Sequence, residues 1–111
     1  MAYDEELAER VRKIVAPEKG SSEKRMFGGL AFLLDGNLAV SASGQGGLLL
    51  RVDPADTERL VAAEHVERFE MRGRKMDGWL HVLPAAVADD AALRAWVAHG
   101  TRYARSLPPK G

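Results

Sequence analysis

The residues of this sequence best suited to binding are cations that cluster near the ends of predicted strands. They lie at the start of the first strand, late in the third strand and around a later turn, at Lys24, Arg25, Arg51, Arg72, Arg74 and Lys75. If the sheet brings these ends together, the cations form a rim that could contact phosphates or orient an acidic partner. Carboxylates at Glu67, Glu70 and Asp77 could instead pair with them, as surface charges commonly do.

A second set of candidates combines methionines with aromatic rings, at Met26, Phe27, Met71, Met76 and Trp79. Flexible thioethers beside aromatic rings pack well in a core, and they also form adaptable binding surfaces. Apolar residues on strands are usually buried, so packing in the core is the first interpretation. The alternative is a seam between two copies of the chain, which a strand edge left accessible near Gly28 and Gly29 would favour.

No local pattern in the sequence indicates catalysis or metal binding. None of the three histidines, His65, His81 and His99, shares a predicted helix face with a second ligand at the i, i+4 spacing of a helical metal site. The chain has no cysteine, which excludes disulfides and thiolate chemistry, and no serine lies in a GxSxG nucleophile motif. The glycines at 44–47 lack the spacing of a phosphate-binding loop. We therefore expect neither a cofactor nor an enzymatic activity.

The composition indicates one domain without overall charge. The chain has 111 residues, 46% hydrophobic and 29% charged, and its 16 cationic and 16 anionic side chains cancel. A neutral protein has no global field to draw it to nucleic acid or anionic lipid, so such binding would need a local patch. The first residues lack the apolar segment of a secretory signal, and no run approaches the roughly 20 apolar residues that span a bilayer. We expect a cytoplasmic location.

Hydrophobic periodicity and turn residues predict the element order α-βββ-α-ββ-α. Helices are expected at 4–15, at 54–64 and from Asp89 or Asp90 to Leu107, and strands at 25–34, 38–43, 47–52, 66–71 and 75–83. Strands and helices do not alternate regularly, so no parallel sheet is required. The predicted fold class is α+β, with an antiparallel sheet of about five strands and the helices packed on one face.

Two glycine-containing steps specify this fold more clearly than any reaction. Asp35 and Gly36 tolerate the positive φ of a tight turn and predict a hairpin. Gly28 and Gly29 remove two consecutive side chains, which allows either a bulge or an unusually close approach of another backbone.

Two other functions compete with docking to a protein. In a nucleic-acid-binding module, the same cations would contact phosphates while Trp79 or Tyr103 stacks on bases. In a small-ligand-binding domain, a pocket between the sheet and the last helix would be lined by Phe32, Trp79 and Trp96.

Four segments of the chain carry a family resemblance. They are KRMFGGLAFLLDGNLAVSA, GLLLRVDP, MRGRKMDGWLHV and the closing TRYARSLPPK. Together they resemble the N-terminal domain of the TfoX/Sxy competence regulators, in its small stand-alone form, over nearly the whole chain. The most specific part is Met26-Phe27-Gly28-Gly29 followed by the Asp35-Gly36 turn, and Arg51-Val52 and Met76-Asp77-Gly78-Trp79 follow in the expected order.

The resemblance implies an α+β domain without enzymatic activity. In full-length members this domain precedes a helical C-terminal domain, and the proteins regulate DNA-uptake genes together with a transcription factor of the cyclic-AMP receptor protein type. The family supplies no catalytic residues to carry over, and its motif residues here either maintain the fold or make contacts. We therefore expect a small regulatory or protein-interaction module whose partner is another protein, such as a transcription factor, or a second copy of the chain.

Overall fold

The computed structural model of the protein describes residues 3–26 and 28–110. Its helices are α1 (Glu5–Val15), α2 (Thr57–Val61) and α3 (Asp90–Ser106), with 3-10 turns η1 (Pro54–Asp56) and η2 (Pro84–Val87). Its strands are β1 (Ser21–Met26), β2 (Gly29–Leu34), β3 (Asn37–Ala42), β4 (Leu48–Arg51), β5 (Val66–Met71) and β6 (Arg74–Val82). The six strands form one antiparallel sheet in the order β1-β2-β3-β4-β6-β5, which confirms the predicted α+β class.

The sheet has one more strand than the sequence pattern indicates, because β1 is a separate strand and only its last two residues, Arg25 and Met26, fall within the predicted strand 25–34. Met26 of β1 lies opposite Gly29 of β2, so the chain reverses direction between them. Gly28 has φ +74, and a Cβ on Gly29 would lie 2.1 Å from the carbonyl oxygen of Ala42 on β3. Both glycines therefore serve the fold, one in the turn and one at a close strand contact. Phe27 lies outside the described residues.

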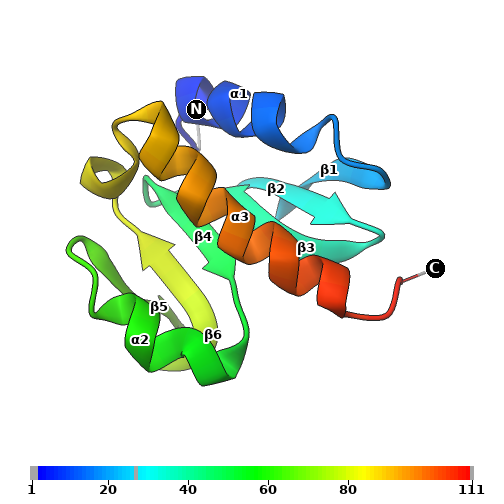
Figure 1. Ribbon diagram of the computed structural model, residues 1–111. Helices are drawn as coiled ribbons and strands as arrows, with labels where there is room; N and C mark the ends of the chain where they lie inside the picture. Colours follow the sequence, from blue (N-terminus) through cyan, green and yellow to red (C-terminus); the bar gives the residue numbers. More distant parts are fainter. Residues whose placement is uncertain (1–2, 27, 111) are drawn as a thin grey trace.

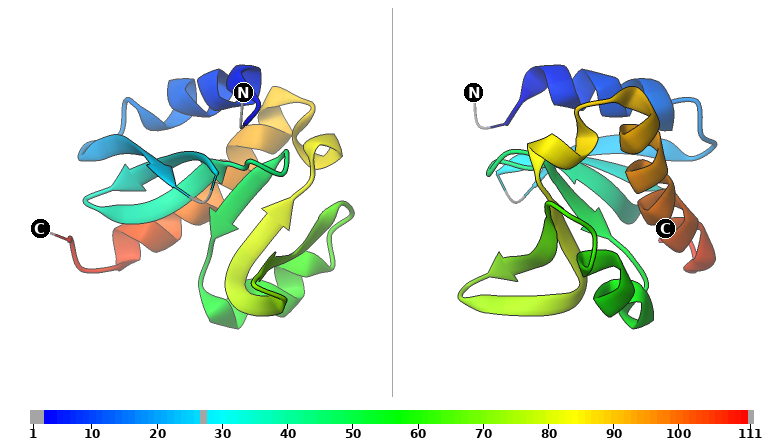
Figure 2. Two further views of the ribbon diagram at one scale, coloured as in Figure 1. Left: turned by 180° about the vertical axis from the view of Figure 1, so that it is seen from behind. Right: turned by 60° about the vertical axis from the view of Figure 1, so that its left-hand side comes forward.

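The helices cover one face of the sheet, as predicted. α3 crosses β3 and β4, α1 lies beside α3, and α2 lies against β5 and β6 (Figure 1). All three helices contribute to a single hydrophobic cluster with the inward side chains of the strands, including Val11, Leu60, Leu93 and Val97. The turn end of the β5–β6 hairpin points away from α3 (Figure 2).

Aspartate side chains cap the N-terminal ends of three segments. Asp4 and Asp89 cap α1 and α3, since their carboxylates accept hydrogen bonds from Leu7 N and from the first amides of α3. Asp53 caps the segment after β4 by accepting from Ala55 N at 2.9 Å. The predicted helix 54–64 is shorter than expected: it begins as the turn η1 and continues as the five-residue α2.

Candidate functional site

The β5–β6 hairpin carries an open groove that combines apolar and cationic side chains. Its volume is about 530 Å³, and it is lined by Gln45, Phe69, Glu70, Met71, Arg72, Arg74 and Met76. Met76 is 37% exposed and is the exposed large hydrophobic residue of the described chain. We call this groove together with the neighbouring exposed Lys75 the hairpin surface. It brings together members of both sets that the sequence singled out separately: the cations Arg72, Arg74 and Lys75 and the methionines Met71 and Met76.

The cations of the hairpin surface have no carboxylate partner within the described chain. Residues 3–26 and 28–110 contain no ion pair of Arg72, Arg74 or Lys75. Two of the carboxylates expected to neutralise them bind elsewhere: Asp77 accepts from Arg68 Nε at 2.8 Å, and Glu67 lies 3.5 Å from Nδ1 of His81. The third, Glu70, lines the groove opposite Lys75 and forms no ion pair within the described residues, so the cations of the hairpin outnumber its carboxylate. The positive charge of the hairpin is therefore available to a partner.

The other predicted cations do not join the hairpin surface, so the six do not form one continuous rim. Lys24 and Arg25 lie on β1, at the opposite edge of the sheet from β5, where neighbouring side chains alternate between faces. Arg25 lines a pocket beside the start of α1 with Tyr3 and Glu9. Arg51 ends β4 in a third location, beneath α3.

Arg51 contacts two aromatic rings. Its Cζ lies 5.3 Å from the ring centroid of Trp79, its cross-strand partner on β6, and 5.6 Å from that of Tyr103 on α3. These distances are within the range of cation–π attraction. The contact explains two motif positions together, because the Arg51-Val52 and Gly78-Trp79 steps meet at this stack.

Hydrogen bonds among Val52, Gly78, Thr57 and Pro54 hold the backbone next to this stack. Val52 N donates to Gly78 O at 2.9 Å, and Gly78 N donates to Oγ1 of the buried Thr57 at 2.7 Å. Thr57 in turn donates to Pro54 O at 2.8 Å. Gly78 has φ +86, and a Cβ there would lie 3.1 Å from Pro54 Cγ, so a larger residue would disturb the support of Trp79.

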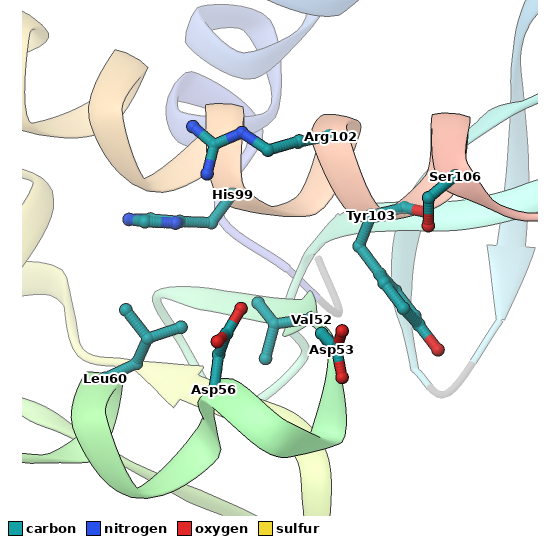
Figure 3. Close-up of a pocket in the computed structure, with 8 residues that line it drawn as sticks. All are labelled: Val52, Asp53, Asp56, Leu60, His99, Arg102, Tyr103 and Ser106. Atoms are coloured by element: carbon teal, nitrogen blue, oxygen red, sulfur yellow. The ribbon is translucent and has the colours of Figure 1, made fainter.

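A separate small pocket opens between α3 and the segment of η1 and α2. Its volume is about 160 Å³, and Figure 3 shows the side chains around it: Val52, Asp53, Asp56, Leu60, His99, Arg102, Tyr103 and Ser106. Drug-sized ligands occupy pockets of roughly 300 Å³ or more, so this space suits a single side chain better than a cofactor. None of Phe32, Trp79 and Trp96, the residues predicted for a ligand pocket, lines it.

The histidine of this small pocket has a lowered pKa. Burial lowers the pKa of His99, and the cations Arg102 and Arg59 lower it further, while Asp56 opposes them. Asp56 itself pairs with Arg59 at 3.3 Å, and Asp53 caps η1. Because these carboxylates already have partners, the pocket does not present a free acid and base in a shared orientation.

His81 has the packing role expected for a strand histidine. Its Nε2 hydrogen-bonds Gly46 O at 2.8 Å, and its ring meets Phe69 edge-on with centroids 5.8 Å apart. These contacts attach the loop between β3 and β4 to the floor of the hairpin surface. Within the described residues there is no group of three or more His, Cys, Asp or Glu side chains that could hold a metal ion.

Sequence reasoning missed Phe69 and Gln45, and it named Tyr103 only as a ring that could stack on bases, not as a contact of Arg51. Phe69 could have been detected, because it lies two positions before Met71 on β5, and residues two apart on a strand share a face. Gln45 comes from the loop after β3, and Tyr103 comes from α3, so no local pattern connects them to the residues they contact.

The structure therefore defines an antiparallel α+β domain with one helix-covered face and a cationic, methionine-containing hairpin. The family model described as the TfoX N-terminal domain matches residues 13–104, and the chain belongs to this family. Searches of curated proteins and of solved structures each found no match. In the part of the chain that the structure describes, no helix is both long and apolar enough to cross a membrane.

Proposed function

We propose that this domain is a non-enzymatic interaction module that binds an acidic protein partner through the hairpin surface. The observation that carries the proposal is the set of Arg72, Arg74 and Lys75, which lack carboxylate partners in the described chain and border an apolar groove. Apolar area at the centre of an interface supplies affinity, and surrounding charge orients the partner and speeds encounter. Met71 and Met76 can adapt to the partner's shape.

The backbone of Arg72 supports this proposal independently. Arg72 has φ +52 in a two-residue turn that favours Asn, Asp or Gly. A non-glycine residue in the left-handed region costs roughly 1–2 kcal/mol, and such strain gathers at functional positions. An arginine at this position destabilises the turn, and we interpret its presence as serving to expose a positive charge at the end of the hairpin.

Family membership suggests the kind of partner. Full-length TfoX-type regulators act on gene expression with a transcription factor, so we propose a component of the transcription machinery with an exposed acidic segment. Two alternative partners of the hairpin surface are a second copy of the chain and DNA. The neutral net charge disfavours DNA, because phosphate binding relies on an excess of cations.

The test is affinity purification from the native host with the wild-type domain and the double variant Arg72→Glu, Arg74→Glu. We expect a partner with an acidic segment to co-purify with the wild type and to be lost with the double variant. The matched control is Lys13→Glu, Lys19→Glu, which reverses two exposed charges outside the hairpin surface. Both variants should melt within a few degrees of the wild type, since exposed substitutions change stability by about 0.5 kcal/mol.

Each result has a defined meaning. A partner retained by the hairpin variant would exclude the hairpin surface as its binding site. Concentration-dependent dimerisation that is abolished by the same variant would replace the heterologous partner with a second copy. Binding of short DNA duplexes at low salt, measured by fluorescence anisotropy and lost with the same variant, would make the domain a nucleic-acid-binding module.

A further inference from the structure

Arg51 differs from the cations that stabilise the fold. Arg12 and Arg105 each donate to carboxylates from other parts of the chain. The guanidinium of Arg51, by contrast, contacts the faces of Trp79 and Tyr103 and makes no hydrogen bond or ion pair with any other described side chain or carbonyl. The fold therefore positions the Arg51 side chain, but its N–H donors have no hydrogen-bond partner among the described residues.

The unused donors of Arg51 face solvent. The side chain is half-buried, and no buried side-chain nitrogen or oxygen of the described residues lacks a partner. The N–H groups of Arg51, which have no partner within residues 3–26 and 28–110, are therefore accessible. The donors of a guanidinium lie around its planar edge, in a fork that matches two acceptor oxygens.

We propose that Arg51 is a carboxylate-binding site, which receives an acidic side chain of the partner in a bidentate contact. Stacking restricts the rotamers of Arg51 before binding, so less side-chain entropy is lost when the carboxylate arrives. A planar carboxylate matches the fork of one guanidinium. A phosphate dianion would call for several cations, whereas the adjacent pocket combines the single arginine Arg102 with the carboxylates of Asp53 and Asp56.

Tyr103 extends this site toward the small pocket. Its ring contacts Arg51 and also lines the pocket of about 160 Å³ between α2 and α3. A partner carboxylate on Arg51 would thus place a neighbouring partner residue at the mouth of that pocket. This inference deepens the proposed function and rests on its premise that the partner is acidic, but it assigns a contact away from the hairpin surface.

The test uses hexaglutamate peptide as the probe and the whole domain as the protein. In the wild type, titration should shift the NMR signals of the Arg51 Nε–H and the Trp79 indole N–H in a saturable manner. Arg51→Gln should weaken binding about tenfold, the effect of losing a charge-assisted hydrogen-bonded pair. Arg51→Lys should weaken it nearly as much, since lysine keeps the charge and loses the fork. Arg94→Gln, at an exposed position of α3, is the control and should stay within twofold.

The results for the different variants distinguish failure of the Arg51 site from failure of the hairpin surface. Equal affinity of wild type and Arg51→Lys would overturn the carboxylate fork, and so would the absence of any shift at Arg51 in the wild type. Inorganic phosphate binding at Arg51 more tightly than the peptide would assign a different ligand class. Loss of peptide binding with Arg51→Gln, but not with Arg72→Glu, Arg74→Glu, would support the Arg51 site and contradict the hairpin surface. Thermal melting of each variant tests whether the fold is retained, and the wild-type NMR shifts need no variant.

Discussion

Two hairpin turns of this domain have the same backbone form and opposite surroundings. Asp35-Gly36 joins β2 to β3, and Arg72-Gly73 joins β5 to β6; all four residues have positive φ. The first turn is tied to the rest of the molecule: Asp35 N donates to Gly20 O at 3.0 Å, and Lys110 N donates to Asp35 O at 2.7 Å. At the second turn, a Cβ on Gly73 would meet nothing within 4 Å.

The difference separates structural residues from those available for binding. Asp35 is a preferred residue for its turn, and it also accepts from Arg105 Nη1 at 3.2 Å. Arg72 is a disfavoured residue for its turn and has no ion pair within the described chain. One turn is thus optimised for stability, while the other gives up stability and presents charge.

The largest expected effect compares the two turn glycines. A Cβ on Gly36 would lie 2.7 Å from Lys110 O, so Gly36→Ala combines left-handed strain with displacement of the C-terminal segment. We expect it to lower the free energy of unfolding by roughly 2–3 kcal/mol, and Gly73→Ala by roughly 1 kcal/mol, from the backbone alone. Urea unfolding measures both values. Equal losses would show that the surroundings of the two turns do not matter.

A smaller difference is expected between the arginines near the two turns. Arg105 bonds Asp35, Glu18 and the carbonyl of Lys19, so Arg105→Ala should destabilise the domain by roughly 1–2 kcal/mol. Arg74→Ala should change stability by no more than about 0.5 kcal/mol, since Arg74 makes no ion pair in residues 3–26 and 28–110. Thermal melting distinguishes the two. A large loss from Arg74→Ala would mean that the hairpin surface has a structural role.

Arg72→Asn should stabilise the domain, whereas the substitutions above destabilise it or leave its stability unchanged. Asparagine adopts positive φ at lower cost, so we expect the free energy of unfolding to rise by roughly 0.5–1 kcal/mol. The same change should weaken capture of the acidic partner, because a hairpin cation is lost. A variant that is more stable and binds as well as the wild type would remove Arg72 from the proposed interface.

The smallest effect concerns pH and a paired charge on β1. Hydrogen bonds from Arg12, whose Nε lies 2.6 Å from one Glu23 oxygen, lower the pKa of Glu23 below its usual value. A carboxyl whose pKa is lowered on folding stabilises the folded state above its unfolded pKa, and this contribution is lost as pH falls through the folded pKa. Glu23→Gln should therefore cost less than about 1 kcal/mol at pH 7. The difference from wild type should disappear in acid, and urea unfolding at several pH values measures it.

Much of the fold was predictable because local rules decide it. The Asp35-Gly36 turn, the Asp89 cap and the second hairpin follow from residue preferences that act over a few positions. β1 was not predicted as a separate strand for a physical reason: its sequence SSEKRM has no alternating apolar residues, and its four central residues are exposed. It becomes a strand only because β2 offers an edge to pair with.

The candidate sites were predictable in residue type and not in arrangement. The cations and methionines of the hairpin surface are neighbours in sequence and remained neighbours in space. Lys24 and Arg25 separated from them because strand order places β1 and β5 at opposite edges. Sequence position cannot report that order, since it depends on which strands pair across the whole sheet.

By itself, the sequence determined the α+β class, the turns and the inventory of charged and sulfur-containing side chains, since each depends on composition or on short-range preference. Only the tertiary structure decided which of those charges are paired and which are free. It placed Arg51 against Trp79 and Tyr103, and it directed Asp77 to Arg68 rather than to the hairpin cations. Such contacts join residues from separate elements, so their geometry depends on how the strands pair and on how α3 packs against the sheet.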